Sequence, residues 1–324
     1  MGKARSPRRG SMQFWPRKRS KHSFVRVRSW AQQNKAKLLG FIAYKAGMTQ
    51  VMILDNRPNS MTKGEKICVP VTVFDCPPIH ALGVSFYKNS GRGAQKVAFM
   101  FSPEISKDAK KIASKKISLS KKEVANLDEV KDFDYLRLLV MSNPSLTTTG
   151  NKKPKFSEMA IGGSKDDQLN YAKETIGKEL KIEDVFNDGN LVDIHAVTKG
   201  KGFQGTVKRY GVAIMQHKAE KCKRGIANMG AWTPKRVDYR ISQPGKMGFH
   251  LRTEYNKQIV KIGDNKDDVN PKSGWQNFGL VKNSYLLLRG SVTGPRKGAV
   301  LLSEAIRPKA KLQKEIGEIV TISK

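Results

Sequence analysis

Residues 199–256 read KGKGFQGTVKRYGVAIMQHKAEKCKRGIANMGAWTPKRVDYRISQPGKMGFHLRTEYN, and the folding of the rest of the chain has to accommodate them. This stretch contains thirteen Lys or Arg, three acidic residues and eight glycines, without a sustained helical or strand period. Its few large apolar side chains are too scattered to offset the cost of ordering the backbone, about 1–2 kcal/mol per residue. We therefore expect a long loop that an external polyanion orders, because phosphates attract Lys and Arg and release counterions.

The composition of the whole chain also predicts a polyanionic partner. Its 324 residues include 61 Lys or Arg and 28 Asp or Glu, which give a net charge of +33. Residues 1–37 carry twelve Lys or Arg and no acid, so this segment and residues 199–256 hold about two-thirds of the net charge. The remainder has the composition of an ordinary globular protein, long enough for one good core or a core with a satellite domain.

The N-terminal segment 1–37 combines its cations with four large aromatic side chains, Phe14, Trp15, Phe24 and Trp30. Cations can contact phosphates while aromatic rings stack on bases or pack locally, so we interpret the segment as a nucleic-acid-binding arm. The alternative is a solvated basic tail, although free tails rarely carry so many large aromatics.

Several other classes of site are disfavoured by the motifs. Cys68, Cys76 and Cys222 form no CxxC pair and have no His at zinc-ligand spacing, so we expect neither a metal site nor a cofactor. Cys222 lies among cations that lower a thiol pKa, but His217 is weak support for a catalytic pair. His80 is expected to be a partly buried strand residue with its hydrogen bonds made, and not a catalytic base.

No apolar run reaches membrane-spanning length and no secretory signal is visible, which predicts a soluble intracellular protein.

The segment Gly200–Gly205 matches the G-x-G-x-x-G pattern of dinucleotide-binding proteins and follows a predicted strand. The surrounding sequence does not fit a dinucleotide-binding site. Gly211 lies only six residues after Gly205, where a helix should continue, and no second βαβ unit is visible. We expect these glycines to let the backbone approach a phosphate chain, flanked by Lys199, Lys201, Lys208 and Arg209. The absence of the common hydrolase, zinc-protease and Walker motifs indicates that the chain is not an enzyme.

The predicted fold is mainly β with an α-helical insertion, a small antiparallel barrel interrupted by two inserted segments. Residues 38–44 and 50–55 are expected to form a hairpin around Lys45–Thr49, and Pro70 should lie at an edge or bulge. Ser120–Glu123 and Ser164–Asp167 have capping-box patterns that predict helix starts, the second helix with Leu169, Ala172 and Ile176 on one face. Further strands are predicted at 66–74, 79–87, 96–101, 135–141, 191–197, 258–262, 285–289 and 299–302, with a turn at 290–295.

These elements suggest a discontinuous β-domain, and the expected divisions follow the changes in composition. They are a basic arm at 1–37, barrel at 38–79, a largely helical insert at 80–185, a barrel strand at 186–198, the basic loop at 199–256, and barrel with a C-terminal tail at 257–324.

Trp232 lies between Gly230 and Pro234, far in sequence from any predicted strand. A Trp is usually packed in a core, but this position favours an exposed loop tip whose ring could stack on a base for about 1–3 kcal/mol.

Four motifs in order resemble the ribosomal protein L three family of the large subunit. They are Lys45–Thr49 after an apolar strand, AVTKGKGFQGTVKRYG at 196–211, GAWTPKRV at 230–237 and GFHLRTEYNKQI at 248–259. The length and the GAW tip are similar to the archaeal and eukaryotic branch of the family.

The resemblance implies a translation-protein-type barrel on the subunit surface, with the arm and the loop threaded into large-subunit rRNA near its 3′ end. It implies a cytoplasmic, ribosome-bound protein that acts early in subunit assembly and extends the loop toward the peptidyl transferase centre. Neighbours would be proteins of the L fourteen and L twenty-four-e families, with neither a membrane nor a small-molecule substrate. The expected rRNA contacts are Arg8, Arg9, Trp15, Arg17, Lys18, Arg19, Lys199, Lys201, Gly202, Lys208, Arg209, Arg224, Trp232, Lys235, Arg236, His250 and Arg252.

The sequence departs from the family at Lys223, where eukaryotic members have a His, and the following stretch to Trp232 is three residues shorter. A modification or switching role tied to that His is therefore not expected here. The alternative from another class is a free-standing, chromatin-type nucleic-acid binder, which should prefer duplex DNA.

Overall fold

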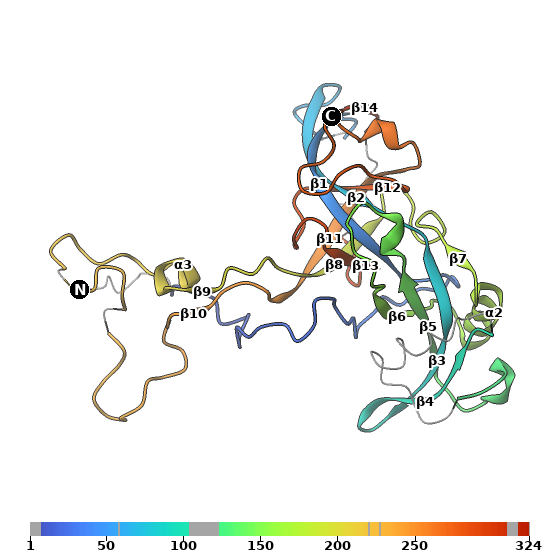
Figure 1. Ribbon diagram of the computed structural model, residues 1–324, viewed down its shortest axis with the longest axis horizontal. Coiled ribbons are helices and arrows are strands. Elements are labelled where there is room, and N and C mark those ends of the chain that lie inside the picture. The colour runs from blue at the N-terminus through green and yellow to red at the C-terminus, as the bar shows by residue number, and fades with distance from the viewer. Residues whose placement is uncertain are drawn as a thin grey trace. The chain divides into compact units, whose positions relative to one another are not determined.

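The computed structural model describes residues 8–57, 59–103, 123–219, 221–226, 228–309 and 317–323. The described parts of Phe24–Ala196 and Thr253–Lys324 form one compact unit, the barrel unit. Those of Met1–Ser23 and Val197–Arg252 form a second, the extension unit. Figure 1 shows both units, and the finer boundaries expected from the sequence remain predictions.

Six strands of the barrel unit form a closed ring, because β1 pairs with β2 on one side and with β13 on the other. The order around the ring is β13, β8, β11, β12, β2 and β1, and β14 adds to the distal half of β1. Its strands are β1 (Gly40–Leu54), β2 (Lys66–Asp75), β8 (Leu191–Val197), β11 (Leu251–Gly263), β12 (Tyr285–Arg289), β13 (Ala299–Glu304) and β14 (Ile319–Ile322). The predicted mainly β, antiparallel and barrel-like architecture is therefore confirmed.

The hairpin predicted at residues 38–55 is wrong, because β1 is one continuous strand of 15 residues. The register with β2 shifts between Lys45 and Gly47, so the glycine marks a β-bulge and not a turn. Gly47 is also required by packing, since a Cβ there would lie 2.3 Å from the ring of Trp275. The bulge helps β1 bend from its pairing with β13 to its pairing with β14.

The second sheet of the barrel unit has the order β4, β3, β5 and β6, with β7 paired to β3. Its strands are β3 (Ile79–Ser90), β4 (Gly93–Phe101), β5 (Tyr135–Ser142), β6 (Phe156–Ala160) and β7 (Glu179–Leu180). The expectation of a largely helical segment at 80–185 is wrong for the described residues, which contain more strand than α-helix. Leu82, Phe99 and Phe101 belong to a small core on this sheet, which explains why the segment folds as strands.

The helix predicted after Ser164 is present as α2 (Lys165–Thr175), and the Ser164–Asp167 capping box has both of its hydrogen bonds. Its buried residues are Gln168, Ala172 and Thr175, so the buried face is rotated from the one predicted. The start predicted at Ser120 lies outside the described residues, while Glu123 forms a bridge with Phe99. Short 3₁₀ turns occur at η1 (Leu127–Glu129), η2 (Pro144–Leu146) and η3 (Lys266–Asp268).

One hydrophobic core cluster of the barrel unit packs residues of β1, β2, β11 and β12 against the segment that connects η3 to β12. Val71, Val73, Tyr285 and Leu287 are fully buried in this cluster, with Trp275 packed against it. The Lys45 Nζ group donates to the carbonyl oxygen of Val292 and so stabilises the turn that was predicted after β12. Pro70 lies just beyond the residues of β2 that pair with β12, where its missing N–H is tolerated.

His195 on β8 is buried between two neighbouring strands of the ring. Its Nδ1 atom lies 3.0 Å from Thr253 Oγ1 on β11, and its Nε2 atom lies 2.9 Å from Ser303 Oγ on β13. Burial lowers the pKa of this imidazole below 6.5, although the nearby Asp193 carboxylate opposes the shift. The neutral ring therefore joins three strands of the barrel.

We predict that the barrel unit loses stability as the pH falls below about 6.5, because the unfolded chain then binds a proton that the folded state resists. The contribution is at most about 1.4 kcal/mol per pH unit, for one proton. His195→Gln should flatten the pH dependence of thermal unfolding between about pH 6.5 and 5. His250→Gln, which changes a half-buried His of the extension unit, should leave the barrel transition unchanged. Equal pH dependence in wild type and His195→Gln would contradict the prediction.

Candidate nucleic-acid interface

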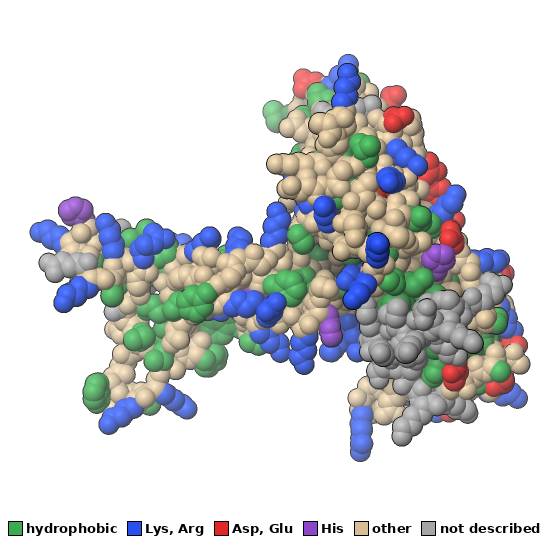
Figure 2. Space-filling view, viewed as in Figure 1, with side chains coloured by type: hydrophobic (Ala, Val, Ile, Leu, Met, Phe, Trp, Pro, Cys, Tyr) green, Lys and Arg blue, Asp and Glu red, His purple; other side chains and the backbone are tan. Residues whose placement is uncertain are grey.

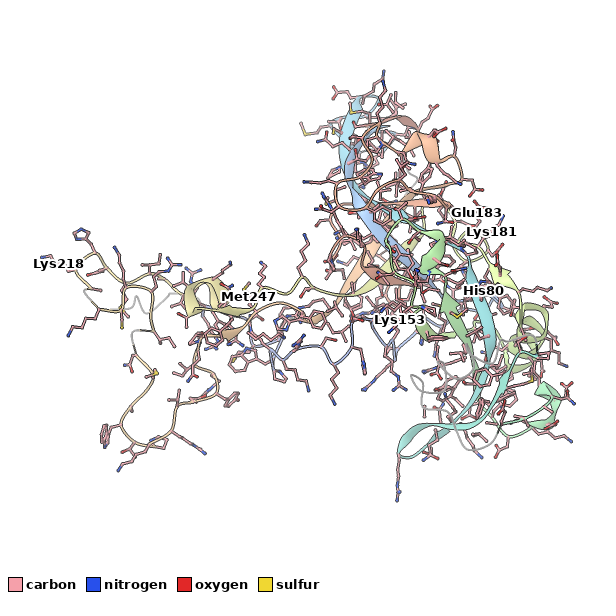
Figure 3. The ribbon with its side chains drawn as sticks, viewed as in Figure 1. His80, Lys153, Lys181, Glu183, Lys218 and Met247 are labelled. Atoms are coloured by element: carbon pink, nitrogen blue, oxygen red, sulfur yellow. The ribbon has the colours of Figure 1, made fainter. Side chains whose placement is uncertain are left out.

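The extension unit contains a short two-stranded stem formed by the outgoing and the returning parts of its long loop. Its short strands are β9 (Phe203–Gln204) and β10 (Gly245–Lys246). The N–H groups of Lys201 and Met247 donate across the stem to Met247 O and Gly202 O, each at 3.0 Å, and Figure 3 labels Met247. Gly248 is needed here, because it has a φ of +79° and a Cβ would lie 2.1 Å from Lys199 O. The stem therefore orders both chain segments by backbone pairing.

A five-residue helix, α3 (Thr206–Tyr210), follows the stem and ends at Gly211, which has a φ of +70°. Arg209 on α3 reaches back to the returning chain. Its Nε and Nη1 atoms donate to Lys246 O at 3.1 Å and to Gln243 O at 2.8 Å. Arg209 thus crosslinks the two sides of the extension.

The N-terminal arm packs on α3 through Arg17 and Tyr210. The Arg17 guanidinium lies 4.5 Å from the centroid of the Tyr210 ring and donates to Ser11 O at 3.0 Å and to Arg209 O at 3.4 Å. Gly10, with a φ of +81°, lies so close to this ring that a Cβ would be 2.3 Å from it.

Three more contacts hold the arm along the extension. Toward the barrel end of the extension chain, His250 Nδ1 lies 2.9 Å from Lys18 O, and the Arg252 guanidinium lies 4.7 Å from the Phe14 ring centroid. The next residue, Trp15, makes an edge contact with Tyr239 at 5.6 Å between ring centroids. The described part of the arm up to Ser23 therefore belongs to the same compact unit as the loop, whereas residues 24–37 belong to the barrel unit.

Positive charge is concentrated in the extension unit. Its described residues include nineteen Lys or Arg but one carboxylate, Asp238. Burial lowers the pKa of Lys246, and the charges of Arg19 and Arg209 lower it further. Burial also lowers the pKa of Arg252, and the charge of Arg17 lowers it by a smaller amount. Figure 2 shows Lys and Arg side chains all along the extension.

The loop beyond α3 exposes large apolar side chains as well as cations. Trp232 is 84% exposed and Tyr239 is 82% exposed, and the Lys235 ammonium lies 6.0 Å from the Trp232 ring centroid. Figure 3 labels Lys218 at one outer turn of the loop. Exposed rings beside cations can stack on unpaired bases while the cations meet the phosphates.

A model of the family described as Ribosomal protein L3 matches residues 1–321. The chain belongs to the ribosomal protein L3 family. It is similar to "Large ribosomal subunit protein uL3" of Methanocaldococcus jannaschii, with 43% identity over 328 aligned residues that cover 98% of this chain and 97% of the relative. The protein of the same name from Methanothermobacter thermautotrophicus is 40% identical, with 100% of this chain and 99% of the relative covered.

The L3 family membership confirms the resemblance read from the four motifs. It also confirms that the chain is not an enzyme, because the family consists of ribosomal proteins with a structural role. In the described residues, no three His, Cys, Asp or Glu side chains gather closely enough to hold a metal ion. Among the same residues, no helix has the length and apolar character needed to cross a membrane.

The site residues predicted from the L3 resemblance fall into two groups in the structure. Trp15, Arg17, Arg209, His250 and Arg252 contact other parts of the extension unit, so each has a structural task besides any contact with RNA. Arg8 and Arg19 are exposed, but they also contact the Trp15 and Phe249 rings. The more exposed group, mostly cations that reach solvent, comprises Arg9, Lys18, Lys199, Lys201, Gly202, Lys208, Arg224, Trp232, Lys235 and Arg236. Their contacts with RNA remain predictions.

Sequence reasoning missed that Tyr210, Tyr239 and Phe249 bind the arm to the loop. The available signal was the match between arginines in the arm and aromatic residues in the loop, since a guanidinium with few carboxylates nearby can pair with a ring.

We predict that Arg209→Met opens the stem locally, because it removes two hydrogen bonds from a charged donor and should cost about 1–3 kcal/mol. Amide hydrogen exchange at Lys201 and Met247 measures this opening. Lys208→Met changes an exposed neighbour on the same helix and should leave both exchange rates unchanged. Equal exchange in the two variants would show that Arg209 does not hold the stem.

We predict that Trp232→Ala leaves thermal unfolding unchanged, because the side chain is 84% exposed. Trp275→Ala should instead lower the unfolding free energy by about 3 kcal/mol, since that ring packs against a buried core cluster of the barrel unit. A large loss of stability in Trp232→Ala would mean that this residue is part of a core.

Proposed function

We propose that the chain is a structural constituent of the large ribosomal subunit and binds its rRNA through the extension unit. The observation that carries the proposal is the excess of cations in that unit, whose described residues include nineteen Lys or Arg and one carboxylate. Such a charge density costs free energy in the isolated protein, and a phosphate backbone relieves the cost. The names of the relatives, which describe them as proteins of the large ribosomal subunit, support the same role.

The stem and the arm contacts indicate how the extension unit works. Backbone pairing at the stem and ring contacts along the arm order the base of the unit before RNA is bound. The exposed cations Lys199, Lys201 and Lys208 remain directed to solvent. RNA then completes the ordering of the loop beyond α3, which is folding coupled to binding.

The finer role rests on the family resemblance. We propose that the ring sheet is a translation-protein-type barrel at the subunit surface in the cytoplasm, and that the extension binds near the 3′ end of the large-subunit rRNA early in assembly. Trp232 would form the loop tip directed toward the peptidyl transferase centre. Proteins of the L fourteen and L twenty-four-e families would cover parts of the barrel unit.

The experiment is a salt titration of binding to a fragment from the 3′ end of large-subunit rRNA, with unrelated RNA and duplex DNA of equal length. We expect tight, steeply salt-dependent binding that prefers the 3′ fragment. Replacing Lys199, Lys201 and Lys208 by Gln should reduce the slope of log K against log salt by about 2–3, because each phosphate contact contributes about 0.7–0.9.

The matched control replaces Lys88, Lys173 and Lys257 by Gln. These lysines of the barrel unit already pair with carboxylates of Asp132, Asp128 and Glu254. The control should keep the wild-type slope although it removes the same charge. Equal slopes for the two triple variants would refute the extension as the phosphate-binding surface, and a preference for duplex DNA would favour a chromatin-type binder.

A further inference from the structure

A hollow of about 410 Å³ lies within the extension unit, between the arm and the loop. Its apolar wall consists of Val212, Ile226 and Ile241 from the loop. Arg8 and Arg9 of the arm contribute positive charge at the same hollow. The hollow is a depression of the surface that is largely open to solvent.

The two sides of this hollow are held by specific contacts. Arg8 Nη2 donates to Arg240 O at 2.6 Å, and the Arg8 guanidinium lies 5.5 Å from the Trp15 ring centroid. Trp15 in turn meets Tyr239, and Ile241 N donates to Asp238 O at 3.1 Å. The hollow therefore lies between segments that are far apart in sequence, since 232 positions separate Arg8 from Arg240.

Asp238 gives the hollow a feature that a plain phosphate site would not need. It is the one described carboxylate of the extension unit, and Arg240 donates to it from both its backbone N–H and its guanidinium. These bonds lower the Asp238 pKa to about 2, so the group is an acceptor at neutral pH. The carboxylate is ion-paired with Arg240, and its remaining lone pairs can accept from the N–H donors at the edge of a base.

We propose that this hollow takes a single unpaired nucleotide of RNA, with its base against Val212, Ile226 and Ile241 and its phosphate toward Arg8 and Arg9. The inference rests on the proposed function and makes it more specific. Sequence-selective recognition of RNA uses bases that leave the helix and enter pockets of this kind, whereas cations along the extension bind any phosphate chain. The hollow would thus select for an extruded base, in addition to the attraction of the cations for any phosphate chain.

The test uses the full chain and two RNA hairpins of equal length and charge, one with a single bulged 2-aminopurine and one fully paired. We expect the bulged hairpin to bind on the order of 10-fold more tightly, the gain of one base contact. The fluorescence of the 2-aminopurine should change on binding as its base leaves water.

Val212→Trp fills the hollow without a change of charge and should abolish the preference for the bulged hairpin while keeping the salt slope for the paired one. Ser242→Phe narrows the same hollow from another position and should act in the same way, which guards against misfolding of either variant. Val237→Trp is the matched control, because Val237 is an exposed valine of the same loop outside the hollow.

The possible results separate this inference from the proposed function. Equal binding of the two hairpins by wild type, or a preference that survives in both filling variants, would overturn the nucleotide site and leave phosphate binding intact. Weak, salt-insensitive binding of both hairpins would instead contradict rRNA binding by the extension itself.

Discussion

Guanidinium groups in the extension unit have almost no carboxylates to pair with, and this constraint determines how the unit holds together. Arg17 lies over Tyr210, Arg252 over Phe14 and Arg19 over Phe249. Arg209 uses backbone carbonyl oxygens of the returning chain. These contacts use aromatic rings and carbonyl oxygens, which do not neutralise the guanidinium charge. The unit is therefore ordered internally while its positive charge can still attract phosphate.

The same constraint explains why the two units differ in composition. The barrel unit is stabilised by burial of apolar side chains such as Val71, Val73 and Leu287, and its surface lysines often have carboxylate partners. The extension unit buries few large side chains and leaves Trp232 and Tyr239 exposed. A polyanion can therefore act on the extension with little effect on the packing that keeps the barrel closed.

The sequence predicted the elements whose local pattern agrees with their tertiary environment. The strands at 66–74 and 285–289 were predicted from short apolar runs and the helix after Ser164 from its capping box, because both are local signals. The hairpin at 38–55 was wrong because Gly47 is required by the distant Trp275 ring and not by a turn. Arm and loop contacts, such as Arg17 with Tyr210, join residues too far apart for any local pattern to reveal.

Closure of the ring depends on the pairing of Gly40–Tyr44 with Ala299–Ser303, which are close to opposite ends of the chain. During synthesis the first barrel strand must wait for nearly the entire polypeptide before it meets this partner. Contacts of such long range slow folding, and strand edges stay open in the meantime. The nascent chain would thus present its basic segments to RNA before the barrel can close, and it would be most prone to aggregation in that interval.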